Sequence, residues 1–160
     1  MPFVTDTTVP EKQRLLSEVI NTLETSLAAL KKAAQDAKEY ATDKDSKAES
    51  KYDTRGLEAS YLAGAQAEKA ESLGDAIELL RNFNLPNLPP EATLGAVVVI
   101  TGDDGQDEAF FILPAGGGIE LESQEQLITV ISHQSPRARS LIGLPAGKML
   151  VGGGFISEIW

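Results

Sequence analysis

Four carboxylates lie close together between Thr42 and Asp53: Asp43, Asp45, Glu49 and Asp53. The last three are spaced four residues apart, so on a helix they would share one face, where like charges repel by about 0.2–0.5 kcal/mol per pair. Carboxylate oxygens are the ligands that a hard cation such as Mg²⁺ prefers. The residue types of this segment therefore suit a tip that attracts cations. The spacing of the acids alone also allows a charged face that is only solvated.

A heptad pattern precedes the acidic segment. From about Pro10 to Ala41, apolar residues recur at alternating intervals of four and three, which predicts a helix whose apolar seam needs a partner helix. The seam consists of Leu16, Ile20, Leu23, Leu27, Leu30, Ala34, Ala37 and Ala41. A dimerising coiled coil is the alternative to pairing within the chain.

A second helix is predicted from Lys47 to about Asn82. Its apolar pattern is looser and consists of Leu57, Tyr61, Leu62, Ala65, Leu73, Ala76, Leu79 and Leu80. The helix also contains Gly64 and Gly74, whose cost of about 1 kcal/mol each would be offset by close packing. Ser46 and Glu49 have the spacing of a capping box, which places the turn at about Thr42 to Asp45. An antiparallel pairing of the two helices would make the acids near residues 42–53 an exposed tip.

The amino-acid composition of the chain limits the classes of function that we expect for it. The chain has 160 residues, 42% of them hydrophobic, a formal net charge of −10 and no cysteine. Such a surface opposes direct binding to nucleic acid, because that affinity comes mostly from Lys and Arg at phosphates. There is no run of about 18 apolar residues, and the first residues lack the basic and apolar regions of a signal peptide. We therefore expect a cytoplasmic monomer with no membrane contact, which meets nucleic acid only through a partner.

The residue composition and the apolar pattern change after residue 83. A proline-rich linker at 84–90 ends the helical part, because proline cannot continue a helix. Beyond it, segments rich in Val, Ile and Phe predict strands at 96–100, 109–113, 127–131 and 155–159. Asp104-Gly105 predicts a hairpin between the first two strands, and the triple glycines at 116–118 and 152–154 predict turns. Ser135 and Pro136 have the residue types of an N-cap and a first helical position, which predicts one short helix from Pro136 to Ile142.

The predicted fold class is therefore α+β. It consists of an N-terminal antiparallel two-helix coiled-coil hairpin at 1–83, the linker at 84–90, and a mostly antiparallel β domain with one short helix at 91–160.

The segment from Ser135 to Gly143 (SPRARSLIG), with the preceding ITVIS at 128–132 and LGAVVV at 94–99 upstream, resembles the C-terminal domain of the bacterial Gre transcript-cleavage factors. The resemblance covers about residues 91–160 by motif. Over residues 10–82 it concerns the architecture, a helical hairpin with acids at its tip. The block from Lys51 to Gln66 is unlike the usual second helix of the family, so the chain resembles a divergent member.

The resemblance implies an FKBP-like domain and a concrete function. Gre factors dock on RNA polymerase at the rim of its secondary channel, and the hairpin reaches the polymerase active site. There a tip acid helps to hold a Mg²⁺ ion, and backtracked RNA is cleaved by the polymerase. By this analogy the chain is no enzyme itself and has no cofactor of its own. Asp45 is the metal-binding candidate, Asp43 and Glu49 are weaker ones, and Ser135, Pro136, Arg137 and Arg139 are candidates for contacting the polymerase.

The tip departs from the family pattern at one position. The family places two acids three residues apart and a tyrosine four residues after the second. Asp45 and Tyr52 match this pattern, but the position of the second acid holds Ala48, and Glu49 lies one residue further. On a helix that shift rotates the carboxylate by about 100°. One alternative is therefore a secondary-channel regulator that modulates or inhibits polymerase without cleavage.

An alternative from another class is a coiled-coil adaptor or an FKBP-like interaction module. It would need a dimeric coiled coil or an aromatic-lined pocket, for which the C-terminal half offers only Phe110, Phe111, Phe155 and Trp160. Trp160 is expected to pack on the globular domain. His133 has no second histidine or cysteine with which to share a metal, so a surface or hydrogen-bonded role is expected.

Overall fold

The computed structural model describes residues 8–42 and 55–160, with side chains for 8–40 and 64–160. The chain divides into two compact units. One consists of residues 22–77. The other, here called the sheet unit, combines residues 1–21 with 78–160, so the first turns of the first helix belong with the sheet. The domain limits of 1–83, 84–90 and 91–160 remain predictions from the sequence.

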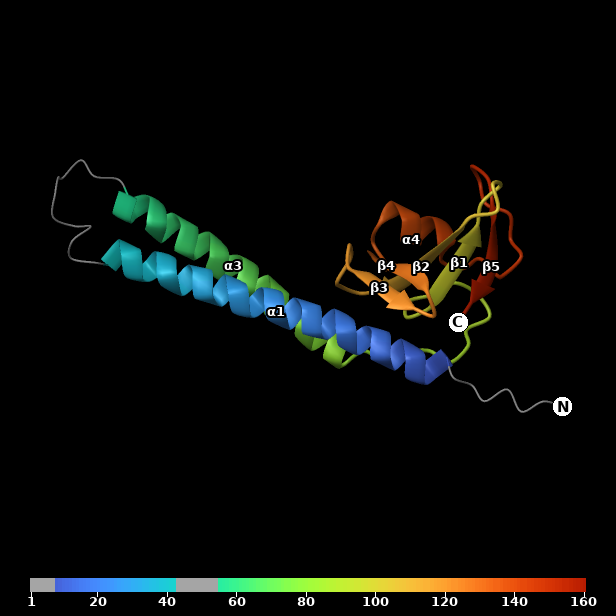
Figure 1. The fold of residues 1–160 in the computed structure, drawn as a ribbon, viewed down its shortest axis with the longest axis horizontal. Helices are drawn as coiled ribbons and strands as arrows, with labels where there is room; N and C mark the ends of the chain where they lie inside the picture. Colours follow the sequence, from blue (N-terminus) through green and yellow to red (C-terminus); the bar gives the residue numbers. More distant parts are fainter. Residues whose placement is uncertain (1–7, 43–54) are drawn as a thin grey trace. The chain divides into compact units, whose positions relative to one another are not determined.

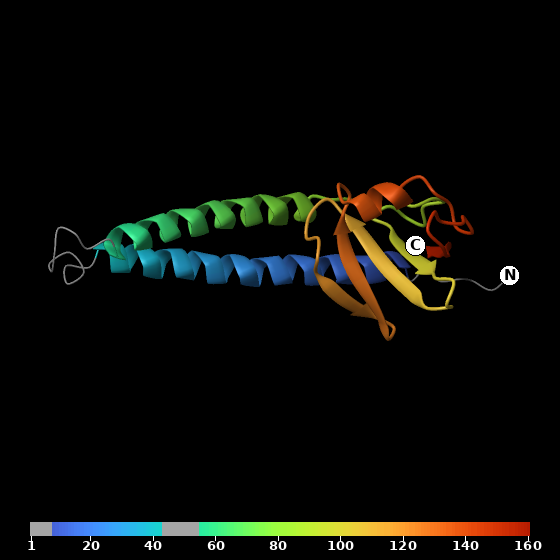
Figure 2. The ribbon, with the colours of Figure 1, turned by 90° about the horizontal axis from the view of Figure 1, so that it is seen from above.

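Two long helices run antiparallel to each other, as Figures 1 and 2 show from two directions. Helix α1 spans Thr8–Thr42 and helix α3 spans Arg55–Arg81. The hairpin predicted from the heptad pattern is therefore confirmed. The described part of the second helix begins at Arg55, and the predicted capping box at Ser46 lies outside the described residues.

The seam predicted on α1 is confirmed where side chains are described. Leu16 and Leu23 are buried, and the positions that follow at Leu27, Leu30 and Ala34 are half-buried. Toward its N-terminus the buried stripe widens to include Lys12, Leu15 and Val19, at the i, i+3, i+4, i+7 spacing of a face packed on a core. The sequence analysis did not include these three residues in the packed face.

The face predicted for α3 is partly wrong. Ala70, Leu73, Ile77 and Leu80 lie on its inner side, at intervals of three, four and three. Leu79 instead is 51% exposed, because it lies about 100° around the helix from Leu80 and points away from the face of Ile77. A Cβ at Gly74 would meet nothing within 4 Å, so close packing does not explain this glycine.

The second half of the chain forms a five-stranded sheet in the order β3-β4-β2-β1-β5. The strands are β1 (Val97–Thr101), β2 (Asp107–Leu113), β3 (Glu120–Ser123), β4 (Gln126–Ser132) and β5 (Phe155–Ile159). β2 pairs in parallel with β4, with Phe111 opposite Val130, and the other three pairings are antiparallel. The prediction of a mostly antiparallel α+β domain is confirmed, including the Asp104-Gly105 hairpin.

The edge strand β3 was not predicted. Its sequence, Glu-Leu-Glu-Ser, contains one strongly apolar residue, yet its burial alternates with Leu121 and Ser123 inward. It forms a hairpin with β4 through Gln124 and Glu125, both of which adopt positive φ angles of 50° and 66°.

Helix α4 (Pro136–Leu141) covers one face of the sheet, above the strands in Figure 1. Its Ala138 and Leu141 join a buried cluster with Val98, Ile112 and Ile156. Side chains alternate along a strand, so Val97 and Phe111 point to the opposite face, where they are equally buried. The described part of the chain contains no helix long and apolar enough to cross a membrane.

Candidate functional site

The predicted tip acids lie outside the described residues. Asp43, Asp45 and Glu49 belong to the segment 43–54, which joins the end of α1 to the start of α3. Their role in binding a metal therefore stays a prediction. Among the residues that the structure describes, no group of three or more His, Asp or Glu side chains could hold a metal ion.

The Ser135 segment folds as its residue types predict. The Ser135 hydroxyl accepts a hydrogen bond of 3.1 Å from the backbone N–H of Ala138, and Pro136 occupies the start of the helix. This cap satisfies one of the N–H groups that a helix start leaves without an intrahelical partner. Ala138 is itself buried in the core cluster, so the capped first turn of α4 packs on the sheet.

The two arginines of α4 differ in their surroundings. Arg137 donates to the Glu108 carboxylate at 3.1 Å and lies over the ring of Phe110, 5.1 Å from the ring centroid. Cation–π and ion-pair contacts of this kind hold the guanidinium plane in one orientation. The exposed side chain of Arg139 has neither an ion pair nor a hydrogen bond among the described residues.

A groove of about 380 Å³ adjoins α4. It is lined by Arg137, Ser140, Leu144, Lys148, Met149, Leu150 and Val151. The sequence analysis predicted Arg137 as a partner-binding residue but missed the segment 144–151. The signal available in the sequence was the scarcity of bases after residue 83, since Arg137, Arg139 and Lys148 are the only three.

A second polar cluster joins the start of α1 to the β3–β4 hairpin within the sheet unit. Glu11 accepts two hydrogen bonds from Arg14, at 2.5 and 3.1 Å, and one from the Ser123 hydroxyl at 2.6 Å. Arg14 also donates to the backbone carbonyl of Glu122 at 3.0 Å. These bonds stabilise the ionised carboxylate, chiefly that from Arg14 and then that from Ser123, and they lower the pKa of Glu11 to about 2.

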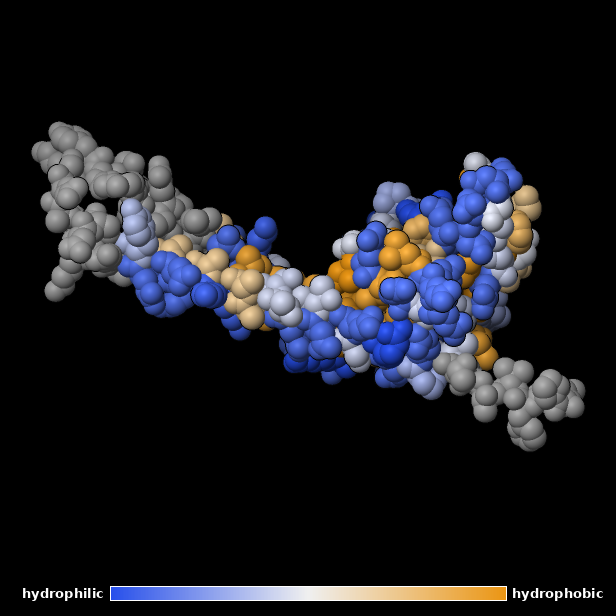
Figure 3. Space-filling view, viewed as in Figure 1, coloured by the Kyte–Doolittle hydropathy of each residue, from blue (hydrophilic) through white to orange (hydrophobic). Residues whose placement is uncertain are grey.

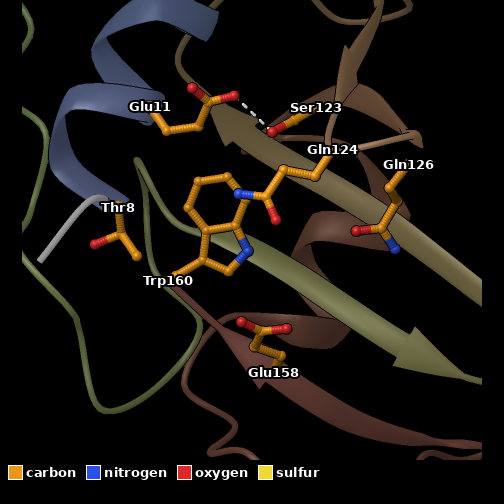
Figure 4. A pocket seen from close by; sticks show the side chains of 7 residues that line it. All are labelled: Thr8, Glu11, Ser123, Gln124, Gln126, Glu158 and Trp160. Carbon is orange, nitrogen blue, oxygen red and sulfur yellow. Dashed lines mark hydrogen bonds between the residues drawn. The ribbon is translucent and has the colours of Figure 1, made fainter. Parts of the chain in front are cut away.

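A small pocket of about 120 Å³ lies beside this cluster (Figure 4). It is lined by Thr8, Glu11, Ser123, Gln124, Gln126, Glu158 and Trp160. The backbone of Trp160 exchanges two hydrogen bonds with Val97, of 2.7 and 3.0 Å, which continues the β1–β5 pairing. The prediction that Trp160 packs on the globular domain is confirmed.

The side chain of His133 is half-buried, so part of it lies at the surface as expected. The residue follows β4, and its backbone N–H donates to the Leu113 carbonyl at 3.1 Å. Its Nδ1 is buried and has no hydrogen-bond partner in the described part of the chain. The hydrogen-bonded alternative is therefore not observed at this ring nitrogen.

No protein-family model matches the chain, and no curated protein matches it. The chain is similar to the crystal structure of GreA factor homolog 1 (Gfh1) of Thermus thermophilus at 18% identity, with 93% of this chain and 94% of that chain covered and a TM-score of 0.34. It is similar to Thermus aquaticus Gfh1 at 18% identity, covering 89% and 92%, with a TM-score of 0.34. A further structure of the transcription factor Gfh1 shows 23% identity, coverage of 88% of both chains and a TM-score of 0.33. These likenesses by themselves assign neither a family nor a function to this chain.

Proposed function

We propose that this chain is a transcription elongation regulator of the Gre type, which binds bacterial RNA polymerase through the secondary channel. In this proposal the helical hairpin enters the channel, and its acidic tip reaches the active site and stimulates cleavage of backtracked RNA. The chain hydrolyses nothing itself and acts as a monomer in the bacterial cytoplasm.

The proposal is supported by one observation. The chain has, in the order that the resemblance implies, a helical hairpin followed by a small α+β domain. An antiparallel hairpin of α1 and α3 precedes a small α+β domain, in which Ser135 caps a helix that lies on the sheet. The motif from Ser135 to Gly143 is specific, and it folds into the capped helix expected of it. A hairpin alone, or a small sheet domain alone, would support many functions.

The tip residues supply the proposed chemistry. Asp45 would hold Mg²⁺ together with the polymerase, with Asp43 and Glu49 as weaker candidates. When bound, Mg²⁺ stabilises charge on the attacking and leaving oxygens of a hydrolysis. Oxygen ligands from one or two carboxylates suit this ion, because Mg²⁺ retains several waters and substrate oxygens in its coordination shell.

The test is transcript cleavage by a halted, backtracked bacterial RNA polymerase complex. We expect the wild-type chain to accelerate cleavage and Asp45→Ala to abolish the acceleration while still binding polymerase. Asp36→Ala removes an exposed carboxylate from α1, and this matched control should retain the effect. A chain that does not bind polymerase at all would overturn the proposal.

A second candidate function is favoured by Ala48, which stands where the resemblance expects the second tip acid. With a single acid at the expected place, the hairpin would occupy the channel and modulate or inhibit polymerase without cleavage. The same assay separates the two functions. Slowed elongation without cleavage, by a chain that competes with a known Gre factor, would establish this second one.

The adaptor or FKBP-like alternative finds less support. Phe111 is fully buried in the core, and Phe110 lies beneath Arg137. The groove beside α4 contains no aromatic side chain. An aromatic-lined pocket, one of the two features on which this alternative could rest, is therefore not found at the groove.

A further inference from the structure

The small pocket beside the start of α1 is lined almost entirely by polar side chains. It belongs to the sheet unit, because α1 contributes Thr8 and Glu11 and the other lining residues come from 123–160. Figure 4 shows the Trp160 indole at its centre, with Glu11 and Glu158 on opposite sides of the ring in this view. The pocket therefore suits a polar ligand that can also lie against an aromatic face.

The charge of the pocket is negative. None of the seven described residues that line it is Lys, Arg or His. Arg14 lies close to Glu11, but its guanidinium binds both Glu11 and Glu18, so one cation serves two carboxylates. Glu158 lines the same pocket and has no ion pair or hydrogen bond within the described part of the chain. A carboxylate without a counter-ion from the chain makes the pocket attract a cation and repel an anion.

Two side-chain amides add oxygen acceptors to the pocket. Gln124 and Gln126 lie at the β3–β4 hairpin, and neither amide has a side-chain hydrogen bond among the residues that the structure describes. Each amide offers a carbonyl oxygen, and Glu158 offers two carboxylate oxygens. A primary ammonium has three N–H donors and no acceptor, so these oxygens match it. A quaternary ammonium has no N–H and would leave them without a partner.

The Trp160 indole supplies a second attraction for a cation. Its ring is half-buried, and the backbone of Trp160 is held by two hydrogen bonds to Val97. Among aromatic side chains, Trp attracts a cation over its face most strongly. The volume of about 120 Å³ is far below the roughly 300–1,000 Å³ of pockets for drug-sized ligands, so the pocket holds a small group only. A single ring among polar side chains also differs from the aromatic-lined pocket of the FKBP-like alternative.

The surrounding surface favours the approach of small cations. Residues 84–160 contain nine acids and three bases, and none of these bases lines the pocket. Figure 3 shows mainly hydrophilic surface where the start of α1, labelled in Figure 1, lies beside the sheet. An acidic surface raises the local concentration of cations and the rate at which they arrive.

We propose that this pocket binds the primary ammonium group of an aliphatic amine. The ammonium lies against the Trp160 indole, pairs with the Glu158 carboxylate and donates to the side-chain oxygens of Gln124 and Gln126. A free diamine and a lysine side chain of another polypeptide present the same group, and their relative affinities distinguish the two sources. The site is independent of the proposed polymerase-binding function, because it uses neither the tip acids nor α4.

The experiment titrates the full chain with n-butylammonium at constant ionic strength. Trp160 is the single tryptophan, so its fluorescence reports on the pocket directly. We expect a saturable change with a dissociation constant on the order of 1–10 mM, as suits a small site that is open to water. Butanol and butyrate, which keep the alkyl chain without the cation, should give no saturable change. Tetramethylammonium, which keeps the cation without N–H donors, should bind more weakly than n-butylammonium.

Variants test the two attractions separately. Glu158→Gln keeps the size of the side chain, removes its charge and should weaken binding about fivefold. Trp160→Leu removes the ring and should weaken binding by about the same factor, measured by NMR on the isotope-labelled chain. Glu120→Gln removes an exposed carboxylate of β3 outside the pocket, and this matched control should bind as the wild type does.

NMR of the labelled wild type provides the location of binding. Amide shift changes should be confined to residues 8–11, 123–126 and 158–160, the three segments that line the pocket. Shift changes elsewhere, a response that does not saturate, equal binding by Glu158→Gln, or an equal response to butanol would each overturn the proposed site. Tighter binding of tetramethylammonium would overturn the assignment of a primary ammonium.

The source of the ammonium is tested with putrescine and with a capped Gly-Lys-Gly peptide. Tighter binding of putrescine would support the site with a free diamine as its ligand, and tighter binding of the peptide would support it with a lysine side chain. Acetylation of the peptide's lysine removes the positive charge and should abolish binding. An acetylated peptide that binds as well as the unmodified one would contradict recognition of the ammonium.

Discussion

The Ser123 hydroxyl donates a 2.6 Å hydrogen bond to the Glu11 carboxylate and so joins the first turns of α1 to the end of β3. Ser123 is buried, and Arg14 completes the link by binding both Glu11 and the carbonyl of Glu122. The start of a long helix is thereby fixed to an edge strand by hydrogen bonds to a charged group, which are stronger than neutral ones.

Glu11→Gln should reduce stability in a pH-dependent manner. The pKa of Glu11 falls from its ordinary value near 4.5 to about 2 in the folded chain, mainly through Arg14 and Ser123. A lowered pKa contributes stability above the unfolded value, and this contribution is lost as the pH falls from about 4.5 toward 2. Arg14 is exposed to water, so we expect the variant to lose only about 1 kcal/mol at pH 7.

Urea unfolding followed by the fluorescence of Trp160, the single tryptophan, measures this difference in the sheet unit. The gap between wild type and Glu11→Gln should shrink as the pH is lowered to 3. Glu18→Gln, which removes another carboxylate that binds Arg14, should cost less because Glu18 is more exposed. A gap that stays constant between pH 7 and pH 3 would contradict the assigned ionisation.

Glu125→Gly should stabilise the sheet unit. Gln124 and Glu125 form the two-residue connection between β3 and β4, and both have φ angles in the left-handed region. Non-glycine residues pay about 1–2 kcal/mol for that conformation, whereas glycine adopts it freely. We expect a gain of about 1 kcal/mol in the free energy of unfolding by urea. Glu122→Gly, at a regular position in β3, serves as the control and should destabilise.

Local patterns of residue types were enough to predict most of the helices and strands. Val97 to Ile100 and Phe110 to Leu113 are runs of strongly strand-forming residues, and the Ser135-Pro136 pair predicts a helix start by a mechanism confined to four residues. β3 was not predicted from the sequence because Leu121 is its one strongly apolar residue. Its strand conformation depends on pairing with β4, which no local pattern displays.

The faces of the helices were harder to predict than their existence. Leu79 and Leu80 are equally apolar, and only the spacing from Ile77 and Leu73 shows that Leu80 is the inward one. The long-range contacts of the candidate site could not be predicted from local sequence patterns. Ser123 binds a residue 112 positions earlier, and the groove depends on which side chains between Leu144 and Val151 remain exposed.

Gly95→Ala should be among the most damaging glycine substitutions. Gly95 has a φ of 87°, and a Cβ there would lie 2.5 Å from Pro86 Cδ and 2.9 Å from Phe83 Cε1. Strain and overpacking together should cost about 2–4 kcal/mol. Gly105→Ala is the matched control, since its φ is 79° with open space around it, and should cost about 1–2 kcal/mol. Equal losses in thermal unfolding would show that the linker contact contributes nothing.

Lys12→Ala should destabilise the sheet unit although it replaces a charged residue. Lys12 is fully buried, and its Nζ donates a 2.6 Å hydrogen bond to the carbonyl of Pro86 in the linker. The substitution removes a buried four-carbon stem and the donor for that carbonyl, so we expect a loss of about 2–4 kcal/mol. Lys12→Met keeps most of the stem and should lose about half as much.

The exposed Lys69 on α3 provides the comparison, because Lys69→Ala should change stability by less than about 0.5 kcal/mol. Urea unfolding monitored by Trp160 fluorescence follows the unit to which Lys12 belongs. If Lys12→Ala were as mild as Lys69→Ala, the start of α1 would not depend on the linker contact. If Lys12→Met were as damaging as Lys12→Ala, the hydrogen bond to Pro86 would outweigh the packing of the stem.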